Sequence, residues 1–236
     1  DFWRVMPYSS ADLDEGEVVR GNADLKPALA KNVDVLAEHF FEGIGILSGG
    51  VFYKQIDDFN FRAEYTEVGG QFDGFDVEQY LNGGSADLFG VELTWQQQFT
   101  QLPGWLAGFG VYANYTYTDA TSIDLGDQTS RTDIAAMPEQ VSDVANFALT
   151  YEKDAIISRL SMNYTGKWIE EVGGSADEDV WRDASTTIDF SFTWMFENGL
   201  DLFLQGNNLS NEVKYAYLGI PSRSSQYSIT GRSYML

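Results

Sequence analysis

The stretch TTIDFSFTWMF at residues 186–196 alternates polar and apolar side chains along its length. A period of two is that of a β-strand whose two faces meet different surroundings. Here one face is almost entirely large and apolar, and the other is polar with Asp189 near its centre. A soluble sandwich and a membrane barrel both use such strands, but they turn the apolar face in opposite directions. The apolar face comprises Ile188, Phe190, Phe192 and Trp194.

Composition excludes several classes of protein. The chain has 236 residues, enough for one large all-β unit. Its net charge of −22 argues against nucleic-acid binding, which needs a basic surface. It has no cysteine, and His39 is the only histidine, so we expect no thiolate or histidine metal site and no cofactor. The acidic loop residues are expected to be solvated charge or to form a weak Ca²⁺ site with oxygen ligands. No apolar run approaches the roughly 18 residues of a membrane helix.

The same alternation recurs along the chain and predicts an antiparallel sheet of about nine strands. Strand charges fall almost wholly on the polar face, so a membrane barrel would direct Glu92, Arg159 and Asp189 toward its lumen. The predicted strands are residues 32–41, 46–56, 86–99, 108–119, 142–152, 156–168, 184–196, 200–210 and 226–236.

Short and long connections alternate between these strands. This alternation is typical of outer-membrane barrels, which have short periplasmic turns and long extracellular loops. An odd number of strands does not close a bacterial barrel, so we expect a segment of a larger one, with residues 1–31 completing a long loop. The short connections are 42–45, 153–155 and 197–199, with 100–107 of moderate length, and the long ones are 57–85, 120–141, 169–183 and 211–225.

Seven motifs in order resemble the TonB-dependent outer-membrane receptors over essentially the whole chain. The LPG at 102–104 and the motif ANYTYTDA at 113–120 most resemble the sequences of the large subfamily that is linked to oligosaccharide uptake. The motifs are GNADLKP at 21–27, VFYKQIDDF at 51–59, FGVEL at 89–93, ANYTYTDA at 113–120, ANFALTYEK at 145–153, GNNLSNE at 206–212 and QYSITGRSYML at 226–236.

The resemblance implies a 22-stranded transmembrane up-and-down barrel that is closed by an N-terminal plug domain. Residues 1–236 would then be a single domain, the C-terminal portion of the barrel without the plug. The implied location is the outer membrane, and the implied partners are membrane lipid, the protein's own plug and TonB–ExbB–ExbD acting through it. The receptor would take up a small ligand such as an oligosaccharide or a metal chelate. This chain would form part of the barrel wall and part of the extracellular vestibule that receives the ligand.

Aromatic residues isolated in the polar loops are the candidate ligand-binding groups. Their rings are expected to stack on sugars, and the alternative is that they pack the long loops against one another. Glu92, Arg159 and Asp189 are expected to pair with plug residues. The acidic loop residues form no recognisable catalytic pair, and no hydrolase or phosphate-loop motif appears, so we expect no enzyme. The candidate aromatics are Tyr65, Phe72, Phe75, Tyr80 and Trp181.

Two alternative functions remain open from the sequence. An iron–siderophore receptor would share the barrel and differ only in its ligand. A secreted soluble all-β carbohydrate-binding module would instead bury Phe190, Phe192 and Trp194 in a core.

Overall fold

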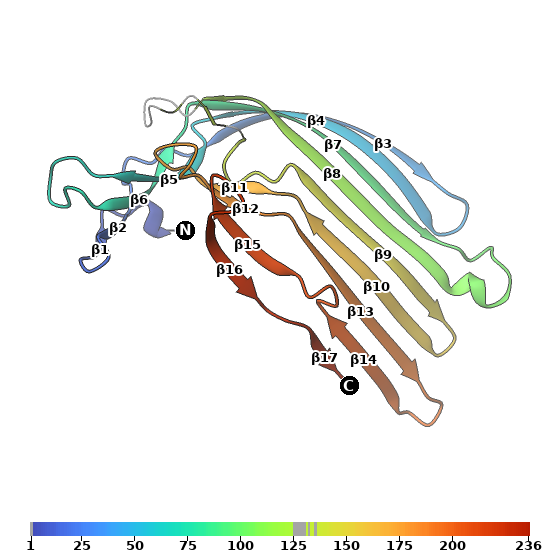
Figure 1. Ribbon diagram of the computed structural model, residues 1–236. Coiled ribbons are helices and arrows are strands. Elements are labelled where there is room, and N and C mark those ends of the chain that lie inside the picture. The colour runs from blue at the N-terminus through green and yellow to red at the C-terminus, as the bar shows by residue number, and fades with distance from the viewer. Residues whose placement is uncertain (1, 125–130, 132, 135) are drawn as a thin grey trace.

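The computed structural model describes residues 2–124, 131, 133–134 and 136–236, and its largest element is a nine-stranded antiparallel sheet (Figure 1). This sheet confirms the predicted all-β fold with nine strands, and its order is β17-β14-β13-β10-β9-β8-β7-β4-β3. Its strands are β3 (Leu29–Phe40), β4 (Gly45–Asp57), β7 (Ser85–Gln98), β8 (Phe109–Asp124), β9 (Asp143–Lys153), β10 (Ile156–Thr165), β13 (Ser185–Met195), β14 (Asp201–Asn207) and β17 (Ser233–Met235).

Two four-stranded sheets lie beyond one end of the nine-stranded sheet, ordered β1-β2-β6-β5 and β11-β12-β15-β16. We call them, with the segments that join them, the loop assembly. Two short 3₁₀ helices are η1 (Phe2–Val5) and η2 (Gly104–Gly108). The strands of the loop assembly are β1 (Ser9–Asp12), β2 (Glu17–Arg20), β5 (Asn60–Thr66), β6 (Asp76–Asn82), β11 (Trp168–Glu171), β12 (Val180–Arg182), β15 (Val213–Leu218) and β16 (Ser224–Ile229).

The loop assembly corrects two expectations from the sequence. Residues 1–31 and the long connections 57–85, 169–183 and 211–225 contain strands, which pair with one another in the two four-stranded sheets and not with the nine-stranded sheet. The predicted strand 226–236 is divided into β16 and β17. The break includes Gly231, whose φ of +71° interrupts an extended strand.

Cross-strand register places the apolar residues of the nine-stranded sheet on one face. Leu47, Trp95, Ala113, Phe147 and Met162 stand opposite one another in successive strands. The polar residues occupy the intervening rows. The period-two alternation of the sequence is therefore a property of the whole sheet, and we call its apolar side the outer face and its polar side the lumenal face.

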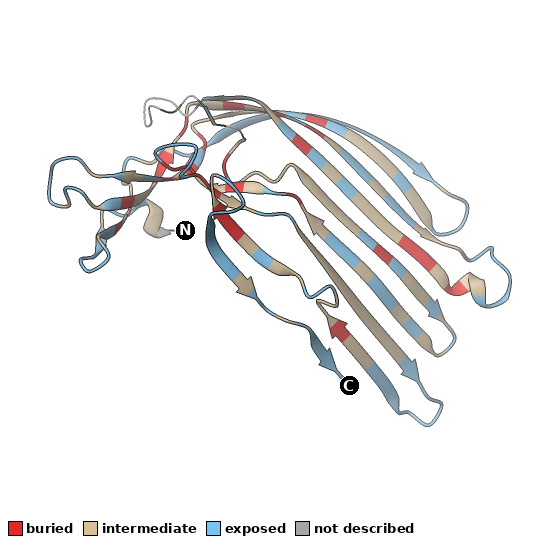
Figure 2. Cartoon of the chain, in the orientation of Figure 1, coloured by how far each residue is buried: buried red, intermediate tan, exposed pale blue. Residues whose placement is uncertain are grey.

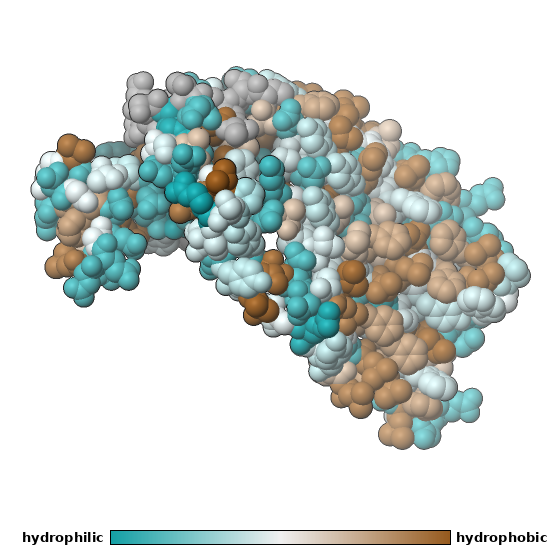
Figure 3. Space-filling view, in the orientation of Figure 1, coloured by the Kyte–Doolittle hydropathy of each residue, from teal (hydrophilic) through white to brown (hydrophobic). Residues whose placement is uncertain are grey.

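No second layer covers the outer face in the described part of the chain. Val35 is 63% exposed, Leu93 50% and Trp194 43%. Figure 2 shows pale blue and tan along most of these strands, and Figure 3 shows brown side chains gathered over the sheet. A soluble module would bury this face, so the structure argues against that alternative. No helix among the described residues is long and apolar enough to cross a membrane.

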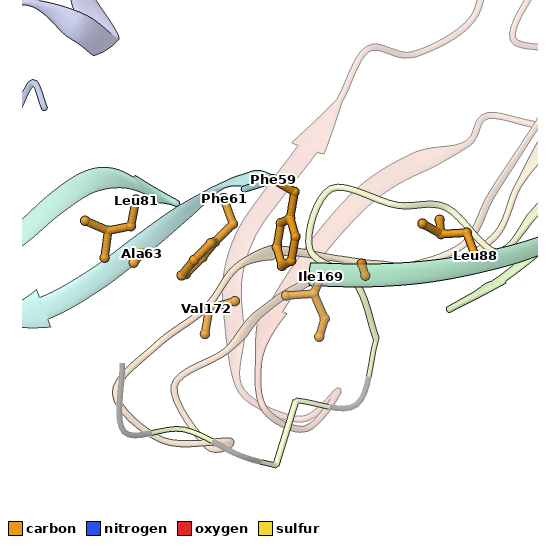
Figure 4. Close-up of a cluster of buried hydrophobic side chains, with 8 residues drawn as sticks. Phe59, Phe61, Ala63, Leu81, Leu88, Ile169 and Val172 are labelled. Atoms are coloured by element: carbon orange, nitrogen blue, oxygen red, sulfur yellow. The ribbon is translucent and has the colours of Figure 1, made fainter. Parts of the chain in front are cut away.

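The main apolar core lies mostly in the loop assembly and extends to β7 of the nine-stranded sheet through Ala86 and Leu88 (Figure 4). It joins the β5–β6 hairpin to β11, although other strands separate them along the chain. Ala63 and Val172 form a parallel bridge, where the Val172 N–H donates to Arg62 O at 3.2 Å and the Glu64 N–H donates to Val172 O at 3.1 Å. The cluster comprises Phe59, Phe61, Ala63, Leu81, Ala86, Leu88, Ile169 and Val172.

Candidate functional site

Two adjacent cavities beside β5 form an acidic cleft in the loop assembly. One, of about 230 Å³, lies between the β5–β6 hairpin and residues 173–178, and the other, of about 200 Å³, lies between β5, β2 and β11. They share Glu64 and Asp76 as lining residues. The cleft's carboxylates are Glu17, Glu64, Asp76, Glu78, Glu171 and Glu178, and its one lining cation is Arg62.

Arg62 is the centre of the cleft's ion pairs. Its Nη2 atom lies 2.6 Å from Glu78 Oε2 and 2.9 Å from Glu171 Oε1. Burial raises the pKa of Glu171 to about 7; Arg62 opposes this shift, and the carboxylates of Glu64, Glu78 and Glu170 add to it. Burial likewise raises the pKa of Glu64. The cleft therefore holds more carboxylates than Arg62 can neutralise.

The cleft's chemistry follows from this excess of negative charge. It repels anions and offers oxygen acceptors to cations and hydroxyl donors. No group of three or more acidic or histidine side chains in the described residues has the geometry to hold a metal ion. The structure therefore provides an acidic surface and no preformed metal centre in the part it describes.

A buried ion pair positions the segment beside the cleft. Arg131 Nη1 and Nη2 donate to the two oxygens of Asp179 at 2.9 and 3.1 Å. Asp179 is 3% exposed and also accepts the Gly173 N–H at 3.0 Å. Hydrogen bonding to Asp179 raises the pKa of Arg131. The pair thus fastens the segment before β9 to the segment after β11.

The five predicted ligand-binding aromatics do not form one platform. Tyr65 lines the acidic cleft, and its hydroxyl donates to Gln79 Oε1 at 2.9 Å. Phe72 and Phe75 lie in the connection between β5 and β6, with ring centroids 5.8 Å apart. Ligand contact by these residues stays a prediction.

Tyr80 and Trp181 pack within the loop assembly, as the alternative for loop aromatics expects. Tyr80 is 6% exposed; Arg4 lies 3.8 Å above its ring, and Trp3 meets it edge-on at 5.8 Å. Trp181 packs on the apolar cluster. Ligand binding by these two rings also stays a prediction, because the contacts that the structure shows for them are with other residues of the chain.

The three predicted lumenal residues lie on the lumenal face, but they differ in their surroundings. Glu92 and Arg159 are exposed and make no ion pair with another described residue. Asp189 accepts the backbone N–H of Asn208 at 2.8 Å, so it stabilises the turn after β14. Contact with a plug stays a prediction for all three.

A row of asparagines on the lumenal face was not predicted. Asn114, Asn146 and Asn163 stand opposite one another in β8, β9 and β10. Asn146 Nδ2 donates to Asn114 Oδ1 at 2.9 Å, and Asn114 Nδ2 donates to the Tyr112 hydroxyl at 2.6 Å. Asparagine at the polar parity of three successive predicted strands was the signal that could have identified it.

Comparisons with known proteins agree with this fold. The family model described as "TonB dependent receptor-like, beta-barrel" matches residues 4–209. No curated protein matches the sequence. A variant of the ferric enterobactin receptor PfeA from Pseudomonas aeruginosa superposes with a TM-score of 0.57 at 16% identity, covering 98% of this chain and 35% of that one.

Two further solved structures are similar at the level of fold. The ferric yersiniabactin uptake receptor FyuA from Yersinia pestis has a TM-score of 0.58 at 17% identity, covering 88% of this chain and 29% of its own. The copper transporter OprC has a TM-score of 0.61 at 15% identity, covering 91% of this chain and 31% of its own. The chain thus spans about a third of the length of these structures.

Proposed function

Because the chain belongs to the TonB-dependent receptor β-barrel family, we propose that it forms part of the wall of an outer-membrane import receptor. The uncovered apolar outer face of the nine-stranded sheet carries this proposal, since hydrocarbon is the solvent that such a face requires. The edge strand β3, exposed at every residue, supports a wall that continues by pairing with further strands.

The lumenal face is the proposed contact for a plug domain. Glu92 and Arg159 supply one charge of each sign there, and a plug could pair with both. Transport would be driven by TonB–ExbB–ExbD acting through that plug. The present chain then contributes the barrel wall and the extracellular vestibule.

We propose a neutral oligosaccharide as the imported ligand. The acidic cleft supports a ligand without negative charge, because its carboxylates outnumber the single Arg62 and would repel an anion. Tyr65 supplies an aromatic ring beside carboxylates that accept hydroxyl hydrogen bonds.

A neutral or cationic metal chelate is the second candidate, and the same cleft favours it by charge attraction. PfeA and FyuA are named for ferric enterobactin and ferric yersiniabactin, and OprC for copper. Their identity to this chain is low, so their names only indicate which chelates to test first. An anionic chelate would oppose the charge of the cleft.

Uptake in a deletion strain separates the two candidates. We expect deletion of the gene to slow growth on oligosaccharides as sole carbon source and to leave growth under iron limitation unchanged. The reverse pattern would favour the chelate, and a complete gene product that folds as a soluble monomer without detergent would contradict the receptor itself.

A pair of variants tests the cleft. Tyr65→Ala should raise the KM for uptake severalfold, because the half-buried ring that lines the cleft is lost as a stacking surface. Tyr234→Ala removes a 71% exposed tyrosine from β17, outside the cleft, and should leave uptake unchanged. Equal effects of both substitutions would exclude a specific role for the cleft.

A further inference from the structure

We propose a saccharide-binding site in a second cavity, outside the acidic cleft, where the wall passes from the nine-stranded sheet into the β11-β12-β15-β16 sheet. The cavity has a volume of about 480 Å³. Small-ligand sites commonly measure about 300–1,000 Å³, so it can hold one or two sugar rings. The residues that carry the argument are Trp168, Glu170, Arg182, Asp183, Lys214 and Gln226.

The cavity exists because strand pairing is interrupted at this level of the wall. β13 pairs with β14 up to Phe190 opposite Gly206, and β12 resumes with β15 at Arg182 opposite Ala216. Between these points the chain diverges at Asn208 and Asn211, whose φ values are +52° and +55°. The opening is therefore built by backbone geometry that asparagine tolerates better than most residues.

Strand parity indicates that the cavity's aromatic wall faces outward. Thr165 stands opposite Ser185, and Trp168 stands opposite Arg182, so both strands advance by the same number of residues. Trp168 and Arg182 thereby keep the parity of Tyr164, which belongs to the outer face. Ile169, at the opposite parity, packs into the core of the loop assembly, as the alternation requires.

An ion pair fixes the polar wall of the cavity. Arg182 Nε donates to Glu170 Oε2 at 2.6 Å, and Arg182 Nη2 donates to Glu170 Oε1 at 2.9 Å. Lys214 and Asp183 add one further charge of each sign, so two cations balance two carboxylates. The cavity is neutral in a chain whose net charge is −22, which favours an uncharged ligand.

Several polar groups at the cavity have no protein partner within the described residues. The half-buried Trp168 indole N–H and Ser228 hydroxyl, and the exposed Lys214 ammonium and Gln226 amide, form no hydrogen bond with another described residue. The Trp168 ring also stacks on no other described ring. An open aromatic face surrounded by unused donors and acceptors suits a sugar, whose ring face is apolar and whose rim carries hydroxyls.

Two sources could supply that sugar: a free neutral oligosaccharide, or the saccharide headgroup of an outer-leaflet glycolipid. Both present the same ring chemistry. The outward direction of Trp168 places the site near the membrane surface if the proposed function holds, and saccharide binding itself does not depend on transport.

Glycan binding by the complete gene product in detergent tests the site. The probes are an array of neutral and sulfated oligosaccharides, and micelles of lipopolysaccharide. We expect neutral oligosaccharide or lipopolysaccharide to bind, with the affinity reduced about tenfold in Trp168→Ala and severalfold in Lys214→Gln. Which probe binds identifies the source.

The control is Trp105→Ala, which removes a 64% exposed tryptophan from η2, in the connection of moderate length between β7 and β8 at the opposite end of the strands. This substitution should leave the affinities for neutral oligosaccharide and for lipopolysaccharide unchanged. Lys214→Gln alters an exposed side chain, so it keeps the test valid if Trp168→Ala fails to fold. Absence of saccharide binding, or binding that neither substitution weakens, would overturn the proposal. Trp168-dependent binding without a transport defect in the deletion strain would retain the site and reject the import function.

Discussion

The nine-stranded sheet and the loop assembly differ in the exposure of their apolar side chains: the sheet exposes them on one face, and the loop assembly buries them. In the sheet, Val35 is 63% exposed and Leu93 50%, and both point away from the polar rows. In the loop assembly, Phe61 and Ile169 are completely buried. One chain therefore contains a region that exposes its apolar side chains and another that buries them, and the boundary between the two regions is where strand pairing is interrupted.

Charges follow the same division. Arg20, Arg62, Arg131 and Arg182 all form ion pairs within the loop assembly. On the sheet, Arg159 lies on the lumenal face, and neutral asparagines of the same face form hydrogen bonds with each other farther along the strands. Long-range order in the loop assembly thus depends on buried apolar contacts and ion pairs, whereas order in the sheet depends on backbone ladders.

The largest expected effect comes from Phe61→Ala in the loop assembly. Loss of this buried ring should destabilise the assembly by about 3–5 kcal/mol. Hydrogen exchange should accelerate in β5, β6 and β11 and stay unchanged in β13. Val68→Ala, at a 93% exposed position of the same hairpin, is the control and should have no effect. Equal acceleration in β13 would show that the two regions unfold together.

Leu160→Arg tests the outer face of the sheet. An arginine at the middle of the hydrocarbon layer should cost about 2–4 kcal/mol in lipid vesicles, measured by reversible unfolding. Asn163→Arg introduces the same side chain on the lumenal face of the same strand and should cost much less. Similar losses for both substitutions would contradict the assignment of the two faces.

Asn208→Ala tests the boundary between the two regions. Asn208 adopts a left-handed conformation; its Oδ1 accepts the Glu212 N–H at 2.7 Å, and its Nδ2 donates to Gly231 O at 3.0 Å. Loss of these bonds should cost about 1–2 kcal/mol and accelerate hydrogen exchange in β15 and β17. Asn32→Ala on β3 serves as the control. An unchanged exchange rate in β15 would mean that other contacts hold the boundary.

The smallest expected effect is the pH dependence of the junction between β5 and β11. The folded protein raises the pKa of Glu171 from an ordinary 4.5 to about 7, so protonation favours the folded state. This stabilisation is complete below about pH 4.5 and is lost as the pH rises through about 7.

Hydrogen exchange at Val172, corrected for the intrinsic rate, should therefore be faster at pH 8 than at pH 5. Glu171→Gln should abolish the difference, and Glu15→Gln, at an exposed turn, should preserve it. A persistent pH dependence in Glu171→Gln would assign the effect to Glu64 or another carboxylate of the cleft.

The candidate site was less predictable from sequence than the sheet. Tyr80 and Trp181 lie in mostly polar stretches of the sequence, as Tyr65 does, although each adjoins one apolar residue, Leu81 and Val180 respectively. Burial separates them, because Trp3 and Arg4 cover Tyr80 from a distant part of the chain. The outward cavity escaped prediction for a similar reason, since Trp168 and Lys214 meet there only through the pairing of β12 with β15.

The sequence by itself determined eight strands of the nine-stranded sheet, β17 being the exception, together with the two faces of the sheet and the ends at which short and long connections lie. A period of two is a local property, so the alternation within each strand already specifies which of its side chains lie on the apolar face of the sheet and which lie on the polar face. The tertiary structure alone decided how the loops fold. β2 pairs in parallel with β6, and Ala63 bridges to Val172. Such choices of partner depend on contacts between distant segments, and no local alternation specifies which edge a hairpin will meet.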